Sequence, residues 1–180
     1  MLSLRLVTLY TRSRFVPAAL AATVAGTLGA AALDTADLRL LSILIGLGVS
    51  AGVVGLGGAD VQLERTGAIS WQTWRLCHLV IVIAVVTGLT VAAGLGTFGI
   101  ILRDTAGLTG LGALSATVLG SQLAWVAPFV WCAIAAVFPI ADEEALMWMI
   151  QPTQSGTATA VASVLGVVGA GVYLSRGPRG

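Results

Sequence analysis

Long apolar stretches alternate with short polar segments along almost the whole chain. A helix that crosses a bilayer needs about 20 predominantly apolar residues, and the boundaries of such stretches are marked by charge, Gly/Pro clusters or aromatic residues. Six stretches fit this pattern, at residues 15–33, 38–58, 74–94, 105–120, 122–138 and 157–174. The pattern therefore predicts an all-α, polytopic membrane protein with about six transmembrane helices.

The fourth predicted span is the weakest of the six. It is short and glycine-rich, and it is preceded by Arg103 and Asp104, the charged pair that interrupts a long apolar run. Ionisable groups at membrane depth are costly unless they are paired or hydrated, and neighbours on a helix point in different directions, so the two need not pair with each other. We expect a fourth span that is broken or re-entrant. The pair then either caps this span at the outer headgroup level or lies at the outer end of a substrate path or subunit seam.

The composition agrees with a membrane protein and excludes several kinds of chemistry. Hydrophobic residues make up 57% of the 180, whereas Lys and Arg together number 9 and Asp and Glu number 8. All nine cations are arginine, so a Walker A lysine is absent and ATP chemistry must belong to another chain. One histidine and two cysteines, Cys77 and Cys132, predict packed thiols rather than a disulfide framework or a metal cluster. We expect no enzymatic activity, no cofactor or metal, and, at a net charge of +1, no nucleic-acid partner.

The distribution of arginine predicts the orientation, because positive charge near a span is retained on the cytoplasmic side. With six spans, seven of the nine arginines are cytoplasmic and only Arg39 and Arg103 are outside, while six of the eight acids are outside. The N-terminal stretch does not resemble a cleaved signal peptide. We expect a cytoplasmic segment 1–14, a six-helix transmembrane domain 15–174 in the inner (plasma) membrane, and a cytoplasmic tail 175–180.

Small residues recur at helical spacing within the predicted spans. Such stripes let helix backbones approach closely in lipid, where the hydrophobic effect does not drive helices together. They predict a tight bundle, with the stripes serving either packing within one subunit or an interface between subunits. The stripes are Gly48 and Gly52, Ala106 and Gly110, and Ala162, Gly166 and Ala170.

The segment between the second and third spans is polar and is expected on the cytoplasmic side. Two glycines end the preceding span, Asp60 can cap a new helix, and Gly67 ends it. We therefore predict a short cytoplasmic helix near residues 60–66, with Glu64 and Arg65 facing solvent. This helix is either part of a solvated loop or the docking element of a soluble ATPase.

The whole layout resembles the membrane subunits of ABC-2-type ABC transporters from actinobacteria. The resemblance rests on the six-span plan, on Asp60 and Glu64-Arg65-Thr66 in the inner loop, and on the segments 74–79 and 103–111. In that family two six-span permease subunits pair, and a coupling helix after the second span contacts the ATPase. The resemblance implies that Asp60, Glu64, Arg65 and Thr66 belong to this helix, and that the partners are a cytoplasmic ABC ATPase and a second permease subunit. The outer loop before the last span is brief compared with the family's re-entrant element.

Two functions follow from these patterns. The first is the permease subunit of an ATP-driven transporter, an exporter, in which ATPase motion reaches the membrane through residues 60–66. The second is a non-transporting membrane partner or scaffold, or a small channel. An apolar seam between subunits is compatible with many kinds of substrate, so the sequence does not identify the substrate.

Overall fold

The computed structural model describes residues 16–31, 37–56, 71–138 and 143–179. Within these residues the chain forms only helices, turns and bends, so the all-α prediction is confirmed. The α-helices are α2 (Val16–Ala31), α3 (Leu38–Val53), α4 (Trp71–Ala92), α5 (Phe98–Val118), α6 (Val126–Val137) and α7 (Gly156–Arg176). Short 3₁₀ helices are η1 (Val54–Leu56), η3 (Ser121–Leu123) and η4 (Trp148–Ile150).

Three helices in the described part of the chain are long and apolar enough to cross a membrane. They are α3 extended by η1 (Leu38–Leu56), α4 and α7, whereas the apolar stretch of η3 and α6 (Ser121–Val137) is shorter. Large apolar side chains point outward on these helices, among them Val80 and Ile81 on α4 and Val167 on α7. Exposed apolar surface on this scale is costly in water and suits contact with lipid. These helices indicate a membrane protein.

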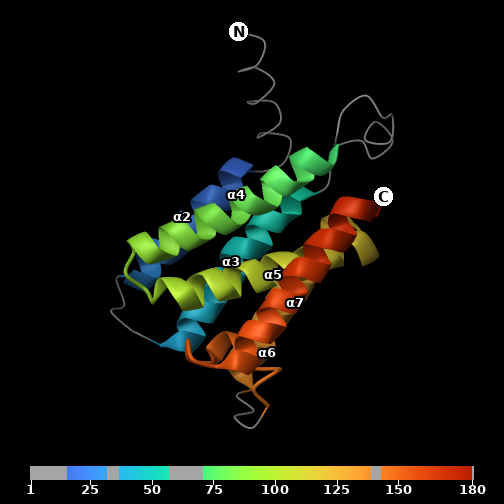
Figure 1. Ribbon diagram of the computed structural model, residues 1–180. Helices are drawn as coiled ribbons and strands as arrows, with labels where there is room; N and C mark the ends of the chain where they lie inside the picture. The colour runs from blue at the N-terminus through green and yellow to red at the C-terminus, as the bar shows by residue number, and fades with distance from the viewer. Residues whose placement is uncertain (1–15, 32–36, 57–70, 139–142, 180) are drawn as a thin grey trace.

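Helix α5 lies in the middle of the bundle, between α4 and α7 (Figure 1). It packs against α3, α4, α6 and α7, most extensively against α7, while α2 packs mainly on α3. Most of its side chains are buried, including those of Leu108 and Ala113. Successive helices from α3 to α7 run in alternate directions, so their ends gather at two opposite ends of the bundle (Figure 1).

One end of the bundle, which we call the arginine end, brings together the last residues of α3, α5 and α7 and the first turn of α4. The Tyr173 hydroxyl donates a hydrogen bond of 2.7 Å to the Leu56 carbonyl. The Arg75 guanidinium lies 5.8 Å from the centre of the Tyr173 ring, and the Arg179 amide donates to the Ala116 carbonyl. Long-range contacts therefore fix this end, because α7 is joined to both α3 and α4.

The opposite end, which we call the acidic end, brings together the starts of α3, α5 and α7 and the end of α6. Gly96, just before α5, lies against Leu41 of α3, and the Trp131 indole N–H donates to the Leu146 carbonyl at 3.1 Å. The charges of the described residues divide between the two ends. The arginine end carries Arg75, Arg176 and Arg179, and the acidic end carries Asp37, Arg39, Arg103, Asp104, Glu143 and Glu144.

The small residues of α5 and α7 face each other within this chain. A Cβ atom added to Gly110 would overlap the Leu165 carbonyl and lie 2.5 Å from Cα of Gly166, and one added to Gly169 would overlap the Gly110 carbonyl. On α3, a Cβ added to Gly52 would lie 2.8 Å from a Val82 methyl group of α4. The stripes predicted from the sequence therefore pack helices of this chain against one another, backbone to backbone between α5 and α7 and backbone to side chain between α3 and α4.

Helix α5 differs from the predicted fourth span in where it begins. The span was expected from residue 105 as a short, broken or re-entrant element, but α5 is a continuous helix of 21 residues that starts at Phe98. The apolar residues before Arg103 form its first turn, and the N-cap is Thr97, whose side chain makes no capping bond. Arg103 and Asp104 consequently lie inside the helix, and the expectation that they cap it is wrong. Because their charges compensate each other, the helix can continue through them.

Candidate functional site

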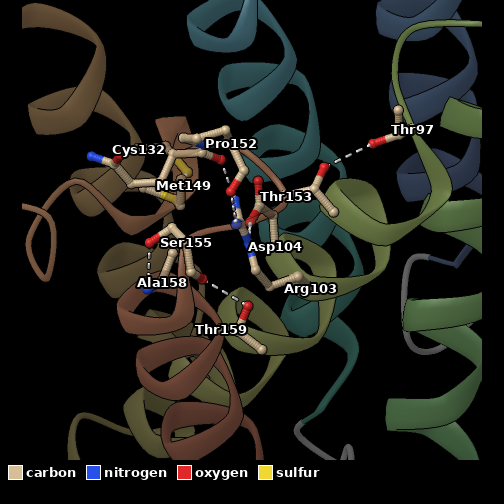
Figure 2. A network of polar contacts seen from close by, with 11 residues as sticks. Thr97, Arg103, Asp104, Cys132, Met149, Pro152, Thr153, Ser155, Ala158 and Thr159 are labelled. Carbon is tan, nitrogen blue, oxygen red and sulfur yellow. Dashed lines mark hydrogen bonds and ion pairs between the residues drawn. The ribbon is translucent and has the colours of Figure 1, made fainter.

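Of the two predicted sites, only the charged pair lies within the described residues. The predicted coupling residues Asp60, Glu64, Arg65 and Thr66 lie outside them, so their assignment stays a prediction. The second predicted site, at Arg103 and Asp104, lies at the acidic end on the second turn of α5. Figure 2 shows it beneath the segment that leads from η4 into α7.

The Arg103 guanidinium makes three hydrogen bonds, of which two join α5 to this segment and one goes to Asp104 on α5 itself (Figure 2). Its Nε donates to Oδ1 of Asp104 at 2.8 Å, Nη2 donates to the Gln151 carbonyl at 2.9 Å, and Nη1 donates to the Pro152 carbonyl at 3.1 Å. The sequence did not require the two neighbours to pair, yet they form an ion pair. The planar fork of arginine suits this role, since it presents several donors in fixed directions. Arg103 therefore fixes the loop before α7 onto α5.

The ion pair is almost completely removed from solvent. The side chains are 6% exposed for Arg103 and 1% exposed for Asp104. Two buried ions cost desolvation energy that their attraction offsets only when further hydrogen bonds satisfy both groups. Arg103 has those bonds, but Oδ2 of Asp104 is buried without a hydrogen-bond partner among the described residues. The carboxylate thus retains one unused acceptor inside the bundle.

Two sulfur atoms lie near the ion pair, on the other side of the same loop (Figure 2). The Cys132 thiol of α6 is 3.6 Å from the Met149 thioether of η4, and the two residues are 3% and 1% exposed. Cys132 also lies against Gly46 of α3, where an added Cβ would overlap its sulfur. Sequence reasoning treated Cys132 as a packed thiol and did not single out Met149. No local pattern indicated the contact, because tertiary structure brings the two residues together.

The loop before α7 is also held by polar contacts of its own. The Ser155 hydroxyl caps α7 by accepting a hydrogen bond from the Ala158 amide at 3.1 Å (Figure 2). The hydroxyl groups of Thr97 and Thr153 are 3.5 Å apart, which links the loop to the residue before α5. The acidic end therefore has a defined structure around Arg103 and Asp104.

The arginine end holds the histidine and the other cysteine. Nε2 of His78 is 3.1 Å from the Gly52 carbonyl, which joins α4 to α3, and Cys77 is exposed. His78 lies at the opposite end from Glu143 and Glu144, so these groups share no site. No group of three or more His, Cys, Asp or Glu side chains suited to a metal occurs among the described residues. A shallow groove of about 410 Å³ between α4 and α7 is lined by Gln72, Thr73, Leu76, Gly171, Leu174 and Ser175.

Comparisons of the chain with protein-family models, with curated proteins and with solved structures find no match. The resemblance to ABC-2-type permeases therefore stays an expectation from the sequence, and the function below is a proposal.

Proposed function

We propose that this chain is the multi-pass permease subunit of an ATP-driven, ABC-2-like exporter in the inner (plasma) membrane. It works with a separate cytoplasmic ATPase subunit and a second permease subunit. The observation that carries the proposal is the distribution of buried surface among the helices. Helix α5 fills the middle of the bundle, whereas only 33% of the most apolar part of α4 and 22% of that of α7 are buried.

The centre of the bundle is filled by side chains, which favours a substrate path along the seam between two subunits over a path through one copy. Buried residues such as Thr105, Leu108 and Ala113 occupy the space that a path through a single copy would need. Helices α4 and α7 instead present apolar faces outward, which suits lipid on one part of the surface and a second membrane subunit on another. The proposed exporter therefore opens between subunits, and the proposal does not extend to the identity of the substrate.

The division of charge between the two ends supports an orientation with both termini in the cytoplasm. Among the described residues, the arginine end carries three cations and no acid, whereas the acidic end carries two arginines and four acids. Positive charge is retained on the cytoplasmic side of a membrane protein. The proposal accordingly places the arginine end inside and the acidic end outside, with six spans.

This orientation predicts which single cysteines react from outside the cell. In a chain lacking Cys77 and Cys132, Glu144→Cys is expected to react with a membrane-impermeant maleimide in intact cells, and Ser175→Cys only after the cells are opened. Both positions are exposed in the described structure, so accessibility within the protein does not limit either reaction. Reaction of both positions in intact cells would contradict the six-span topology.

The experiment that tests the function removes the predicted coupling contact. Glu64→Ala/Arg65→Ala is expected to weaken ATPase capture in co-expression pull-downs and to abolish most of the substrate-stimulated ATP hydrolysis. Exposed ion pairs contribute only about 0 to 1 kcal/mol to stability, so the unfolding temperature of the double variant should stay close to that of the wild type. Coupling is therefore lost without loss of the fold.

The matched control removes one acid and one arginine from the acidic end. Arg39 and Glu144 are both exposed, and Arg39→Ala/Glu144→Ala should retain both complex formation and hydrolysis. If the Glu64 and Arg65 variant kept full complex formation and full stimulated hydrolysis, the coupling assignment would be withdrawn. The alternative function, a non-transporting membrane partner, would then be preferred.

A further inference from the structure

We propose that the groove between α4 and α7 at the arginine end binds one anionic phospholipid, with its headgroup and one acyl chain in the groove. The groove is open to the surface, has a volume of about 410 Å³, and is lined by Gln72, Thr73 and Leu76 of α4 and by Gly171, Leu174 and Ser175 of α7. A volume of this size is typical of small-molecule sites. The proposal rests on the membrane-spanning length of α4 and α7 and does not depend on the proposed transport function.

The groove lies where the lipid headgroups meet the ends of two membrane-spanning helices. Its lining comes from the first turns of α4 and the last turns of α7, which meet at the same end of the bundle (Figure 1). Trp74, which follows the lining residue Thr73 on α4, is 46% exposed, and tryptophan is enriched at the headgroup level of a membrane. Arg176 ends α7 and is exposed to solvent. A lipid in the groove therefore has its phosphate level with these polar and aromatic side chains.

The lining changes from polar to apolar along the groove, as a phospholipid does from headgroup to acyl chain. The three polar lining residues lie nearest the helix ends, and Leu76 and Gly171 lie one helical turn further in. The apolar stripe continues at helical spacing, because Val80 comes four residues after Leu76 and Val167 comes four residues before Gly171. Val80 and Val167 are 55% and 73% exposed. The headgroup thus meets the polar part of the groove, and one acyl chain follows the apolar stripe.

The charge at this end selects an anionic headgroup. Arg176 directly follows the lining residue Ser175. Arg75 lies between the same two helices, since its guanidinium is 5.8 Å from the centre of the Tyr173 ring and its Nη2 would lie 2.6 Å from a Cβ added to Gly177. Among the described residues this end carries no acid. Basic pockets between membrane helices attract anionic headgroups, whereas the ammonium group of a zwitterionic lipid is repelled by the same arginines.

The test is native mass spectrometry of the purified full-length chain in detergent, titrated with phosphatidylglycerol or with phosphatidylcholine of the same acyl chains. The wild type is expected to bind one phosphatidylglycerol molecule roughly tenfold more tightly than phosphatidylcholine. Gly171→Trp should remove most of this binding, because no heavy atom lies within 4 Å of a Cβ added there and the indole fills the groove without disturbing helix packing. Arg176→Gln should weaken phosphatidylglycerol binding roughly fivefold and leave phosphatidylcholine binding unchanged.

Matched controls separate the groove from general lipid adhesion. Gly88→Trp makes the same change at an exposed position of α4 outside the groove, where an added Cβ also meets no heavy atom within 4 Å. Arg39→Gln removes an exposed arginine at the acidic end. Both should bind phosphatidylglycerol like the wild type. Unfolding temperatures without added lipid, with Leu76→Trp as a second variant that fills the groove from α4, separate loss of binding from loss of the fold.

Three results would each overturn the proposal. The first is equal affinity of the wild type for the two lipids. The second is binding by Gly171→Trp that equals the wild type, or an equal loss in Gly88→Trp. The third is a dimer of the chain that Gly171→Trp dissociates without displacing lipid, since the groove would then hold a second copy of the chain.

Discussion

Gly110→Val is expected to lower the free energy of unfolding by about 3 kcal/mol or more, because it places a branched side chain where two backbones touch. A Cβ at Gly110 already overlaps the carbonyl of Leu165 and approaches Cα of Gly166. A backbone atom cannot move aside as a flexible side chain can, so α5 and α7 must separate. Since this is the most extensive helix contact in the described bundle, we expect aggregation or a large fall in unfolding temperature in detergent.

The control for this prediction is Gly171→Val on α7. No heavy atom lies within 4 Å of a Cβ added at Gly171, so the same change of residue type should alter the unfolding temperature little. Thermal unfolding followed by circular dichroism and by size-exclusion chromatography measures both variants. Similar stability of Gly110→Val and Gly171→Val would mean that α5 and α7 do not approach through Gly110.

Arg103→Leu is the second substitution with a large expected effect, and it should lower the free energy of unfolding by about 3 to 5 kcal/mol. The substitution leaves the Asp104 carboxylate buried without its counter-ion and frees the carbonyls of Gln151 and Pro152. An uncompensated buried charge costs more than the ion pair itself contributes, so the single variant overstates the value of the pair. Thermal or denaturant unfolding of detergent-solubilised protein measures the loss.

The double variant Arg103→Leu/Asp104→Leu, measured with the single variant Asp104→Leu, completes a double-mutant cycle. Replacing both ions by apolar groups removes the unpaired charge, so this variant should recover a large part of the lost stability, short of the contribution of the two carbonyl contacts. Arg39→Leu, an exposed arginine at the same end, should change stability by less than about 0.5 kcal/mol. Equal losses for the single and double variants would show that the buried charge is not the source of the effect.

The sequence by itself determined the class of the protein and the positions of most helices. Apolar stretches of membrane-spanning length placed helices close to where α3, α4 and α7 are found, because length and hydropathy are local properties of the chain. The small-residue stripes also indicated close helix packing. Their spacing reveals a face suited to a neighbour but does not identify that neighbour, and only the fold pairs Gly110 with Gly166.

The tertiary structure decided the start of α5 and the partners of its buried groups. Hydropathy placed the boundary at Arg103 and Asp104 because each charge opposes burial on its own. In the fold the two neutralise each other, and the carbonyls of the loop before α7 satisfy the guanidinium, so the helix begins at Phe98. The contact between Cys132 and Met149 is likewise decided by the tertiary structure, which brings α6 and η4 together. The energy of a buried polar or sulfur group depends on what surrounds it, and those surroundings come from distant parts of the chain.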